Sequence, residues 1–185
     1  MSATSLNRSE SHAPPVGTTS TPLPLQQVGL GMLRLGFGWA LFWSGIDKVF
    51  GLGFATTPEQ SVLAGVSPTK GFLLYGLQAD APAAALLKPL VGNPVADALF
   101  LLATVGAGLA LLLGVGTRVA SIGGGVLMLN LWFASLPLEY NPFLDQHLFY
   151  AVAALSVLAF DSGRYLGLGN AWRNLPLVRA NRWLI

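Results

Sequence analysis

The sequence contains no cysteine and only two histidines, His12 and His147. The lack of cysteine excludes disulfides, thiolate metal sites, iron–sulfur clusters and a cysteine nucleophile. Two histidines are too few for a multi-histidine centre within one chain, so we expect no haem, iron–sulfur cluster or metal. The glycines form neither GxGxxG nor GxxxxGK[ST], and therefore do not indicate a nucleotide phosphate site.

Charged residues are also scarce. Only 10% of the 185 residues are Asp, Glu, Lys or Arg, whereas soluble domains carry about 25%. Hydrophobic residues make up 53% of the chain and the mean hydropathy is +0.60. The formal net charge of +2 is too small for a polybasic nucleic-acid-binding protein. The composition therefore predicts the lipid bilayer as a partner and excludes nucleic acid.

Long stretches without charge locate the predicted membrane spans. Ala98 to Thr117 and Val119 to Leu138 are each 20 residues without Asp, Glu, Lys or Arg, and about 20 apolar residues cross roughly 30 Å of hydrocarbon. Two further apolar segments flank this pair. We therefore predict an all-α membrane protein, a four-transmembrane-helix bundle within residues 25–163. Its spans are expected at about 25–46, 97–116, 119–138 and 142–161.

The segments outside the spans predict the topology. Residues 1–24 are polar and rich in Ser, Thr and Pro, without the pattern of a signal peptide, and are expected to form a disordered tail. Residues 164–185 combine four arginines with two tryptophans, which is typical of a basic tail at the membrane interface. We therefore expect a multi-pass protein of a bacterial or archaeal plasma membrane. The distribution of Lys and Arg predicts that both termini lie in the cytoplasm.

The connection between the first two spans, residues 47–94, then faces outward. It is longer than a turn requires, and its apolar pieces are separated by prolines. Long connections are often functional. We expect short extra helices here that lie on the outer membrane surface or cap the bundle; a segment that only floats at the interface is the alternative.

Arg34 is the costliest polar residue within a predicted span. A central arginine costs about 2.5–3.5 kcal/mol and usually has a partner or a function. Arg34 precedes Asp47 by 13 residues, roughly 20 Å along a helix, which is too deep for its side chain to reach the outer surface. One interpretation is structural, with the side chain bonded to backbone carbonyls or to Asn130. The other is functional, with the cation holding an anionic or carbonyl-bearing ligand.

Polar residues also gather at the outward ends of the spans. Asp47 and Lys48 end the first span, whereas Asp145 and His147 begin the fourth. An up-down bundle brings these ends to one membrane face. There a helix N-terminus favours the ionised Asp145, and His147 can exchange a proton. This pattern predicts a small site under the long connection, although several members could simply cap helices. The candidate catalytic residues are Arg34, Asp47, Lys48, Asp145 and His147.

Aromatic residues of the first and third spans could form a flat apolar slot for a quinone ring. Plain packing of these rings is the alternative. The candidate cofactor-binding residues are Trp39, Trp43, Asn130 and Trp132, and the cofactor considered is a quinone. Small residues at helical spacing predict where the helices touch, because close backbone approach holds helices together in lipid. These residues are Gly36, Ala40 and Ser44 in the first span, and Ala103 and Ala107 in the second.

Two stretches of the chain resemble the DoxX/DoxD family of membrane proteins. They are LRLGFGWALFWSGIDK, from Leu33 to Lys48, and NPFLDQH, from Asn141 to His147. GVSPT at Gly65, GNP at Gly92 and the segment Gly108–Val115 look like the DoxD branch. The similarity covers about residues 28–170 and implies a four-helix membrane bundle.

DoxD proteins are similar to the large subunit of thiosulfate:quinone oxidoreductase, which couples thiosulfate to tetrathionate and passes electrons to quinone together with a second subunit, DoxA. The resemblance therefore implies a membrane subunit of a quinone-linked oxidoreductase with a DoxA-like partner. The alternative is a non-catalytic accessory subunit that docks to a larger respiratory or redox complex. A transporter is the least favoured class, because no inverted repeat or chain of intramembrane charges is evident.

Overall fold

The computed structural model describes residues 24–77 and 81–185. Within these ranges every regular element is a helix and there is no β-strand, so the predicted all-α class is confirmed. The predicted N-terminal tail, residues 1–24, lies outside the described residues except for Pro24.

Four long helical segments follow one another in the predicted order. The second is one continuous helix made of α3, η5 and α4, where η5 is a π-helical segment. The segments are α1 (Leu25–Phe50), α3 (Pro94–Leu101) with η5 (Leu102–Gly106) and α4 (Ala107–Leu113), α5 (Thr117–Ala134), and α6 (Gln146–Ala159).

Short helices occupy the long connection, as expected, and also the C-terminal region. The connection contains η1 (Pro58–Gln60), η2 (Val62–Ala64), η3 (Phe72–Gly76), α2 (Ala84–Leu87) and η4 (Lys88–Leu90). The C-terminal region contains η6 (Ser162–Arg164), α7 (Gly169–Arg173), α8 (Pro176–Ala180) and η7 (Arg182–Leu184).

Local capping residues set where the long helices begin. The Asn93 side chain accepts hydrogen bonds from the N–H groups of Val95 and Ala96, and Pro94 occupies the first turn of α3, where its missing N–H costs nothing. Asp145 caps α6 in the same way. The fourth helix therefore begins at Gln146, four residues later than the sequence predicted, and its 14 residues are only about 21 Å long.

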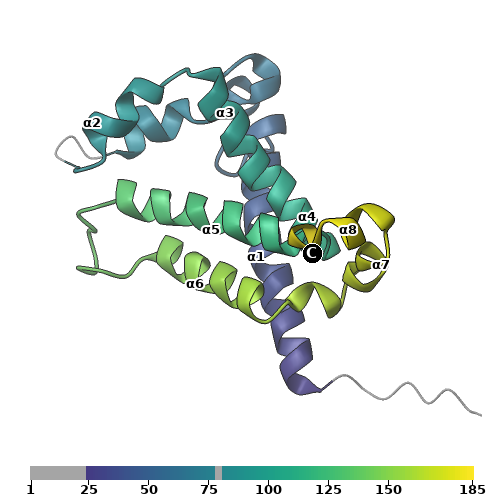
Figure 1. Ribbon diagram of the computed structural model, residues 1–185. Coiled ribbons are helices and arrows are strands. Elements are labelled where there is room, and N and C mark those ends of the chain that lie inside the picture. Colours follow the sequence, from purple (N-terminus) through teal and green to yellow (C-terminus); the bar gives the residue numbers. More distant parts are fainter. Residues whose placement is uncertain (1–23, 78–80) are drawn as a thin grey trace, which may run out of the picture.

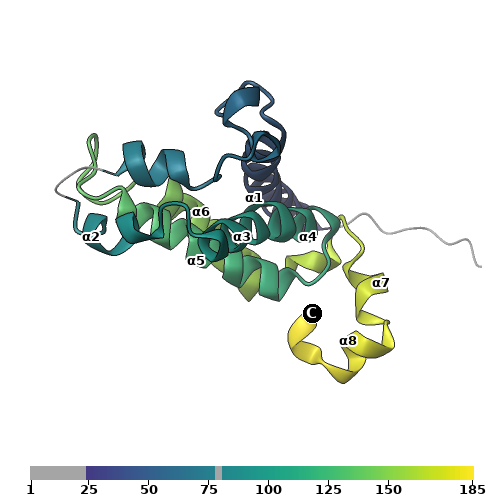
Figure 2. The same cartoon turned by 90° about the horizontal axis from the view of Figure 1, so that it is seen from above.

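The helices cross rather than stand in parallel. Helices α5 and α6 pack side by side and run across α1, whereas the continuous helix α3–η5–α4 leans along α1 (Figures 1 and 2). The hydrophobic core lies at this crossing. Its buried residues are Phe37, Leu41, Leu111, Ala120, Met128, Ala154 and Val157.

Glycines bring α1 and the continuous helix together, but not at the positions that the sequence indicated. A Cβ atom on Gly38 would lie 2.9 Å from the Cβ of Leu111, and one on Gly45 would lie 2.7 Å from the Thr104 hydroxyl. The predicted contact residues Gly36 and Ser44 are exposed instead. The contact face of α1 is thus turned away from the predicted one, toward the face that also carries Arg34.

Among the described residues, one helix is long and apolar enough to cross a membrane. It is the continuous helix Pro94–Leu113, with 20 residues and a mean hydropathy of 2.1. Helix α6 is apolar but shorter, and α1 carries Arg34, Asp47 and Lys48 within its 26 residues. The finer prediction of a four-span bundle is therefore not confirmed.

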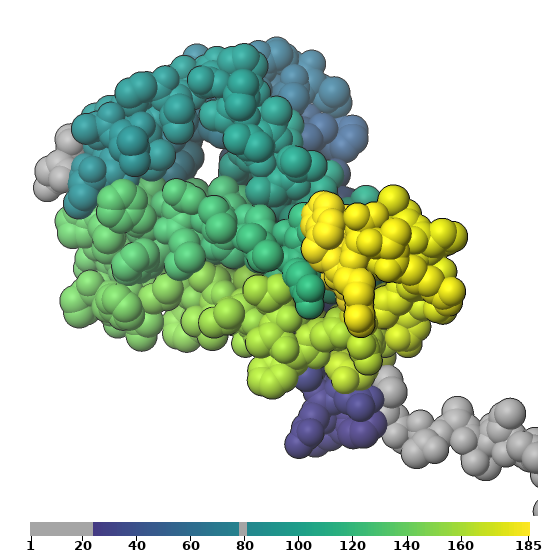
Figure 3. Space-filling view, viewed as in Figure 1, coloured from purple at the N-terminus to yellow at the C-terminus, as the bar shows by residue number. Residues whose placement is uncertain are grey.

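The C-terminal segment folds back onto the turn between α4 and α5. The indole N–H of Trp172 donates to the carbonyl of Leu184 at 2.7 Å, and the backbone N–H of Arg118 donates to the carbonyl of Ile185 at 3.0 Å. We call Gly169–Leu184 the C-terminal hook. It lies beside α4 and the start of α5 in Figure 1 and covers them in Figure 3.

Candidate functional site

The continuous helix and α5 diverge from the turn that joins them. Helix α5 contacts mainly the α4 and η5 parts of that helix, so α3 and the far end of α5 stand apart. The long connection bridges this gap, with Leu73, Leu77 and Ala83 packed against Ala134. The result is a wedge-shaped cavity of about 1110 Å³. Figure 3 shows an opening between α5 and the teal residues of the connection and α3.

The cavity has two chemically different ends. Its apex lies at the turn and is lined by Trp172 and Trp183 of the hook. Its wide side lies between α3 and the end of α5. Polar residues lining the cavity on that side are Ser44, Lys48, Thr69, Asn93, Asn130 and His147. The remaining lining is mostly apolar, which is typical of sites that bind small molecules with a few fixed polar groups.

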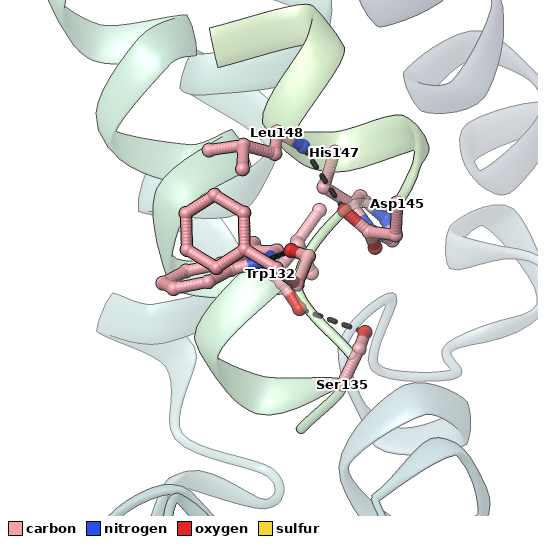
Figure 4. Close-up of polar contacts among 7 residues, drawn as sticks. Trp132, Ser135, Asp145, His147 and Leu148 are labelled. Carbon is pink, nitrogen blue, oxygen red and sulfur yellow. Dashed lines mark hydrogen bonds and ion pairs between the residues drawn. The ribbon is translucent and has the colours of Figure 1, made fainter. Parts of the chain in front are cut away.

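His147 is positioned by Asp145. Its Nδ1 lies 2.6 Å from one carboxylate oxygen of Asp145, and the two side chains are only 19% and 18% exposed. The other carboxylate oxygen accepts the N–H of Leu148 at 3.0 Å, which fixes the carboxylate at the start of α6 (Figure 4). A carboxylate at Nδ1 selects the tautomer that carries the proton there. His147 Nε2, which has no partner in the described part of the chain, is then free to accept a proton.

Lys48 reaches the cavity from a different wall, the last turns of α1. It is half-buried and forms no hydrogen bond or ion pair within residues 24–77 and 81–185. Gly45 lies against Thr104, so Lys48, one turn further along α1, is level with the wide half of the cavity. An ammonium group that lines an apolar cavity without a counter-ion is a candidate for binding an anionic or carbonyl oxygen.

Arg34 is engaged elsewhere. Its side chain is fully buried and its guanidinium donates to four backbone carbonyls, two of them in the last turn of α4. The acceptors are Leu111, Leu112 at 3.1 Å, Tyr165 at 2.9 Å and Leu166 at 2.9 Å. The last carbonyls of a helix have no partner within it and form its negative end. Arg34 therefore caps α4 and ties the segment after η6 to it.

This arrangement corresponds to the structural interpretation of Arg34. Arg34 bonds to backbone carbonyls and not to Asn130, whose side-chain amide donates to the carbonyl of Val126. Arg34 also does not line the cavity. Close packing leaves no room for a ligand. Gly114 has φ 76°, and a Cβ on Gly167 would lie 3.0 Å from a terminal nitrogen of Arg34. In this structure Arg34 therefore caps α4 and lies outside the cavity.

Asp47 also serves the backbone. Its carboxylate is 2% exposed and accepts the N–H groups of Phe54 at 3.3 Å and Ala55 at 3.0 Å. It therefore folds the loop after α1 back on the helix end. Asp47 does not line the cavity, so the structure does not bring it into a common site with Lys48 and His147.

The predicted aromatic slot is not assembled. Trp39 and Trp43 stack on each other with ring centroids 5.4 Å apart, and Trp43 meets Phe54 edge-on at 5.0 Å. Trp132 packs against Phe143 and its indole N–H donates to the carbonyl of that residue at 2.9 Å. None of these tryptophans lines the cavity. Of the four candidate cofactor-binding residues, only Asn130 does.

Residues that are not among the predicted site residues close the cavity. Asp97 accepts hydrogen bonds from the hydroxyls of Ser67 at 2.8 Å and Thr69 at 2.6 Å, which fastens the long connection to α3. Trp172 and Trp183 were expected to anchor the chain at the interface, yet they line the apex. No sequence pattern marks these roles, because each depends on a contact between distant segments.

The described residues contain no group of three or more His, Cys, Asp or Glu placed to hold a metal ion. Comparison of the chain with models of known families, with curated proteins and with solved structures gives no match. The resemblance to the DoxX/DoxD family therefore stays a prediction that depends on the sequence motifs.

Proposed function

We propose that this protein is a membrane subunit of a quinone-linked oxidoreductase of the DoxD type, with thiosulfate as electron donor. One observation carries the proposal. An apolar cavity of about 1110 Å³ has on one wall a lysine without a partner among the described residues, and on another wall a histidine positioned by a carboxylate. The nature of the donor comes from the family resemblance alone.

The exterior supports a membrane location. Large apolar side chains are exposed on each long helix, whereas soluble monomers rarely expose extended apolar patches. Examples outside the cavity lining are Leu109 and Leu113 on the continuous helix, Ile122 and Leu129 on α5, and Phe149, Val152 and Leu155 on α6. The four-span topology with both termini in the cytoplasm stays a prediction. One contact supports it: the C-terminus lies at the α4–α5 turn beside Arg118. The predicted topology places this turn and the arginine-rich C-terminal segment on the same, cytoplasmic side, in keeping with the positive-inside rule.

The residues on the wide side fit a quinone headgroup. A quinone needs an apolar slot and hydrogen-bond donors at its oxygens, and on reduction it takes up two electrons and two protons. Lys48 and His147 can donate hydrogen bonds to such oxygens, and the contact with Asp145 holds the His147 ring in place. The Lys48 ammonium also attracts a dianion such as thiosulfate.

Binding of a short-tailed benzoquinone to the purified protein tests this proposal. We expect saturable binding by calorimetry, weakened about tenfold, or about 1.4 kcal/mol, in Lys48→Ala and in His147→Ala. Lys88→Ala is the matched control, because Lys88 is exposed and lies outside the cavity lining. Absence of saturable binding, or equal affinities in Lys48→Ala and Lys88→Ala, would overturn the proposal.

The accessory-subunit alternative has its own supporting observation. Trp39, Phe50 and Phe54 are 53%, 52% and 74% exposed along the C-terminal half of α1 and the loop after it, a face that another subunit could cover. Purification in mild detergent separates the two functions. Thiosulfate-dependent quinone reduction by the chain alone supports the enzyme, whereas turnover that appears only with a companion chain supports the accessory role.

A further inference from the structure

Small side chains line the cavity between its wide side and its apex. On the continuous helix they are Ala103, Gly106, Ala107 and Ala110, and on α5 they are Ala120 and Gly123. Small residues on facing helices permit close contact, and Ala107 and Ala110 do pack against the core that includes Ala120. The cavity continues along this seam, where the small side chains leave space beside the contact. Lining residues from Ala96 to Ala110 extend over about 21 Å of helix. The open path is therefore long and narrow.

The C-terminal hook forms the end of this path. Trp172, Trp183 and Leu184 line the apex together with Val115 and Gly116. Trp172 is fixed by its hydrogen bond to the Leu184 carbonyl, and Val178 of α8 is 1% exposed, so the hook is packed in place. Trp183 is 60% exposed although it lines the cavity. It therefore stands where the path meets the exterior.

We propose that the path holds the hydrocarbon tail of the ligand, and that Trp172 and Trp183 set the tail length that the site accepts. The polar groups of the wide side and the purely apolar path fit an amphiphile with a polar head and one long chain. This inference rests on the proposed function for the identity of the head, a quinone ring. The tail path itself follows from the shape and lining of the cavity, and it gives the hook a role in specificity.

A photoreactive ligand tests the path in the wild-type protein. The probe is a benzoquinone whose saturated tail is long enough to span the path and ends in a diazirine. We expect saturable labelling in Trp172–Leu184 or Val115–Val119, mapped by mass spectrometry and suppressed by unlabelled quinone of the same tail. Saturable labelling confined to the peptides that carry Lys48, Thr69 and His147 would overturn the tail path while leaving the proposed function intact.

A second probe separates the path from the identity of the head. It is a long-chain fatty acid with a terminal diazirine, whose carboxylate also suits Lys48 and could come from a lipid. If the quinone probe gives no saturable labelling but the fatty acid labels the hook, the proposed function fails and the tail path stands. If neither probe labels the hook, the tail path is overturned.

A variant tests whether the hook limits tail length. Trp183→Ala removes an indole that forms no hydrogen bond in the described part of the chain. We expect the affinity of this variant for a quinone whose tail is longer than the path to rise about tenfold relative to a short-tailed quinone. The extra methylene groups can then occupy the space left by the indole. Trp39→Ala is the matched control, an exposed tryptophan outside the cavity lining. An unchanged length preference in folded Trp183→Ala, with thermal unfolding as the check on folding, would overturn the role of the hook.

Discussion

Two cationic side chains of α1, Arg34 and Lys48, lie one on each side of its centre and have opposite environments. Arg34 is fully buried and bonded to four carbonyls. Lys48 is half-buried, lines the cavity and has no partner in the described part of the chain. The difference teaches that burial cost alone does not identify a functional cation. What matters is whether the protein already uses the donors, because a guanidinium whose two terminal nitrogens donate to four carbonyls has little left for a ligand.

The largest effect is expected at Arg34, the cation bonded to four carbonyls. Arg34→Met leaves the carbonyls of Leu111, Leu112, Tyr165 and Leu166 without their donor, and each buried unpaired group costs about 1–3 kcal/mol. We expect the free energy of unfolding to fall by more than about 3 kcal/mol, measured by denaturant titration in detergent. If Arg34→Met kept wild-type stability but lost quinone binding, Arg34 would be a ligand-binding residue and its contrast with Lys48 would not hold.

A smaller loss is expected at the buried carboxylate of the same helix. Asp47→Ala removes the acceptor for the N–H groups of Phe54 and Ala55, and hydrogen bonds to a charged group contribute about 1.5–3 kcal/mol. We expect a destabilisation of about 2 kcal/mol, with faster proteolysis in the loop after α1. Reduced ligand affinity without this loss of stability would place Asp47 among the binding groups instead.

A loss of about 1 kcal/mol is expected where the connection is fastened to α3. Thr69→Val removes one of the two hydroxyl donors to Asp97. Because Asp97 is only half-buried and keeps the Ser67 donor, we expect the loss to lie below the range for buried charged groups, at about 1 kcal/mol. Hydrogen exchange in residues 67–73 should accelerate, since this segment also covers the cavity. Unchanged exchange there would show that the apolar contacts with Ala134 hold the connection without Asp97.

The smallest effect on stability is expected at the unpaired cation. Lys48→Met keeps a side chain of similar length and breaks no bond within the described part of the chain, so unfolding should change by about 0.5 kcal/mol or less. Denaturant titration beside Arg34→Met checks this directly. A loss as large as that of Arg34→Met would mean that Lys48 is a structural residue, and the contrast between the two cations would disappear.

Some of the fold could be predicted from the sequence. The order of the four long helices follows from apolar stretches separated by polar or proline-rich ones. Each stretch is about as long as one helix, and its side chains favour apolar surroundings. The start of α6 was placed at 142 because hydropathy does not detect an Asp145 cap. The contact face of α1 was also misplaced. Small residues recur at helical spacing on more than one face of this helix, so their spacing alone does not identify the face that contacts a neighbour.

The candidate site was predictable only in part, for a physical reason. The residue types that can hold a proton or a charge were visible, and Lys48, Asn130 and His147 do line one cavity. Arg34, Asp47 and the three tryptophans were equally visible but lie elsewhere. A side chain's type gives its capacity to bind, whereas the position of its backbone neighbours decides whether that capacity is already used.

The sequence by itself determined an all-helical chain with few charges, no thiol chemistry and an apolar character throughout, because composition and periodicity are local properties. Only the tertiary structure decided that α5 diverges from the continuous helix, that the connection bridges the gap and that the hook closes its apex. These features depend on contacts between segments far apart in the chain, and such contacts are set by the packing of the whole molecule.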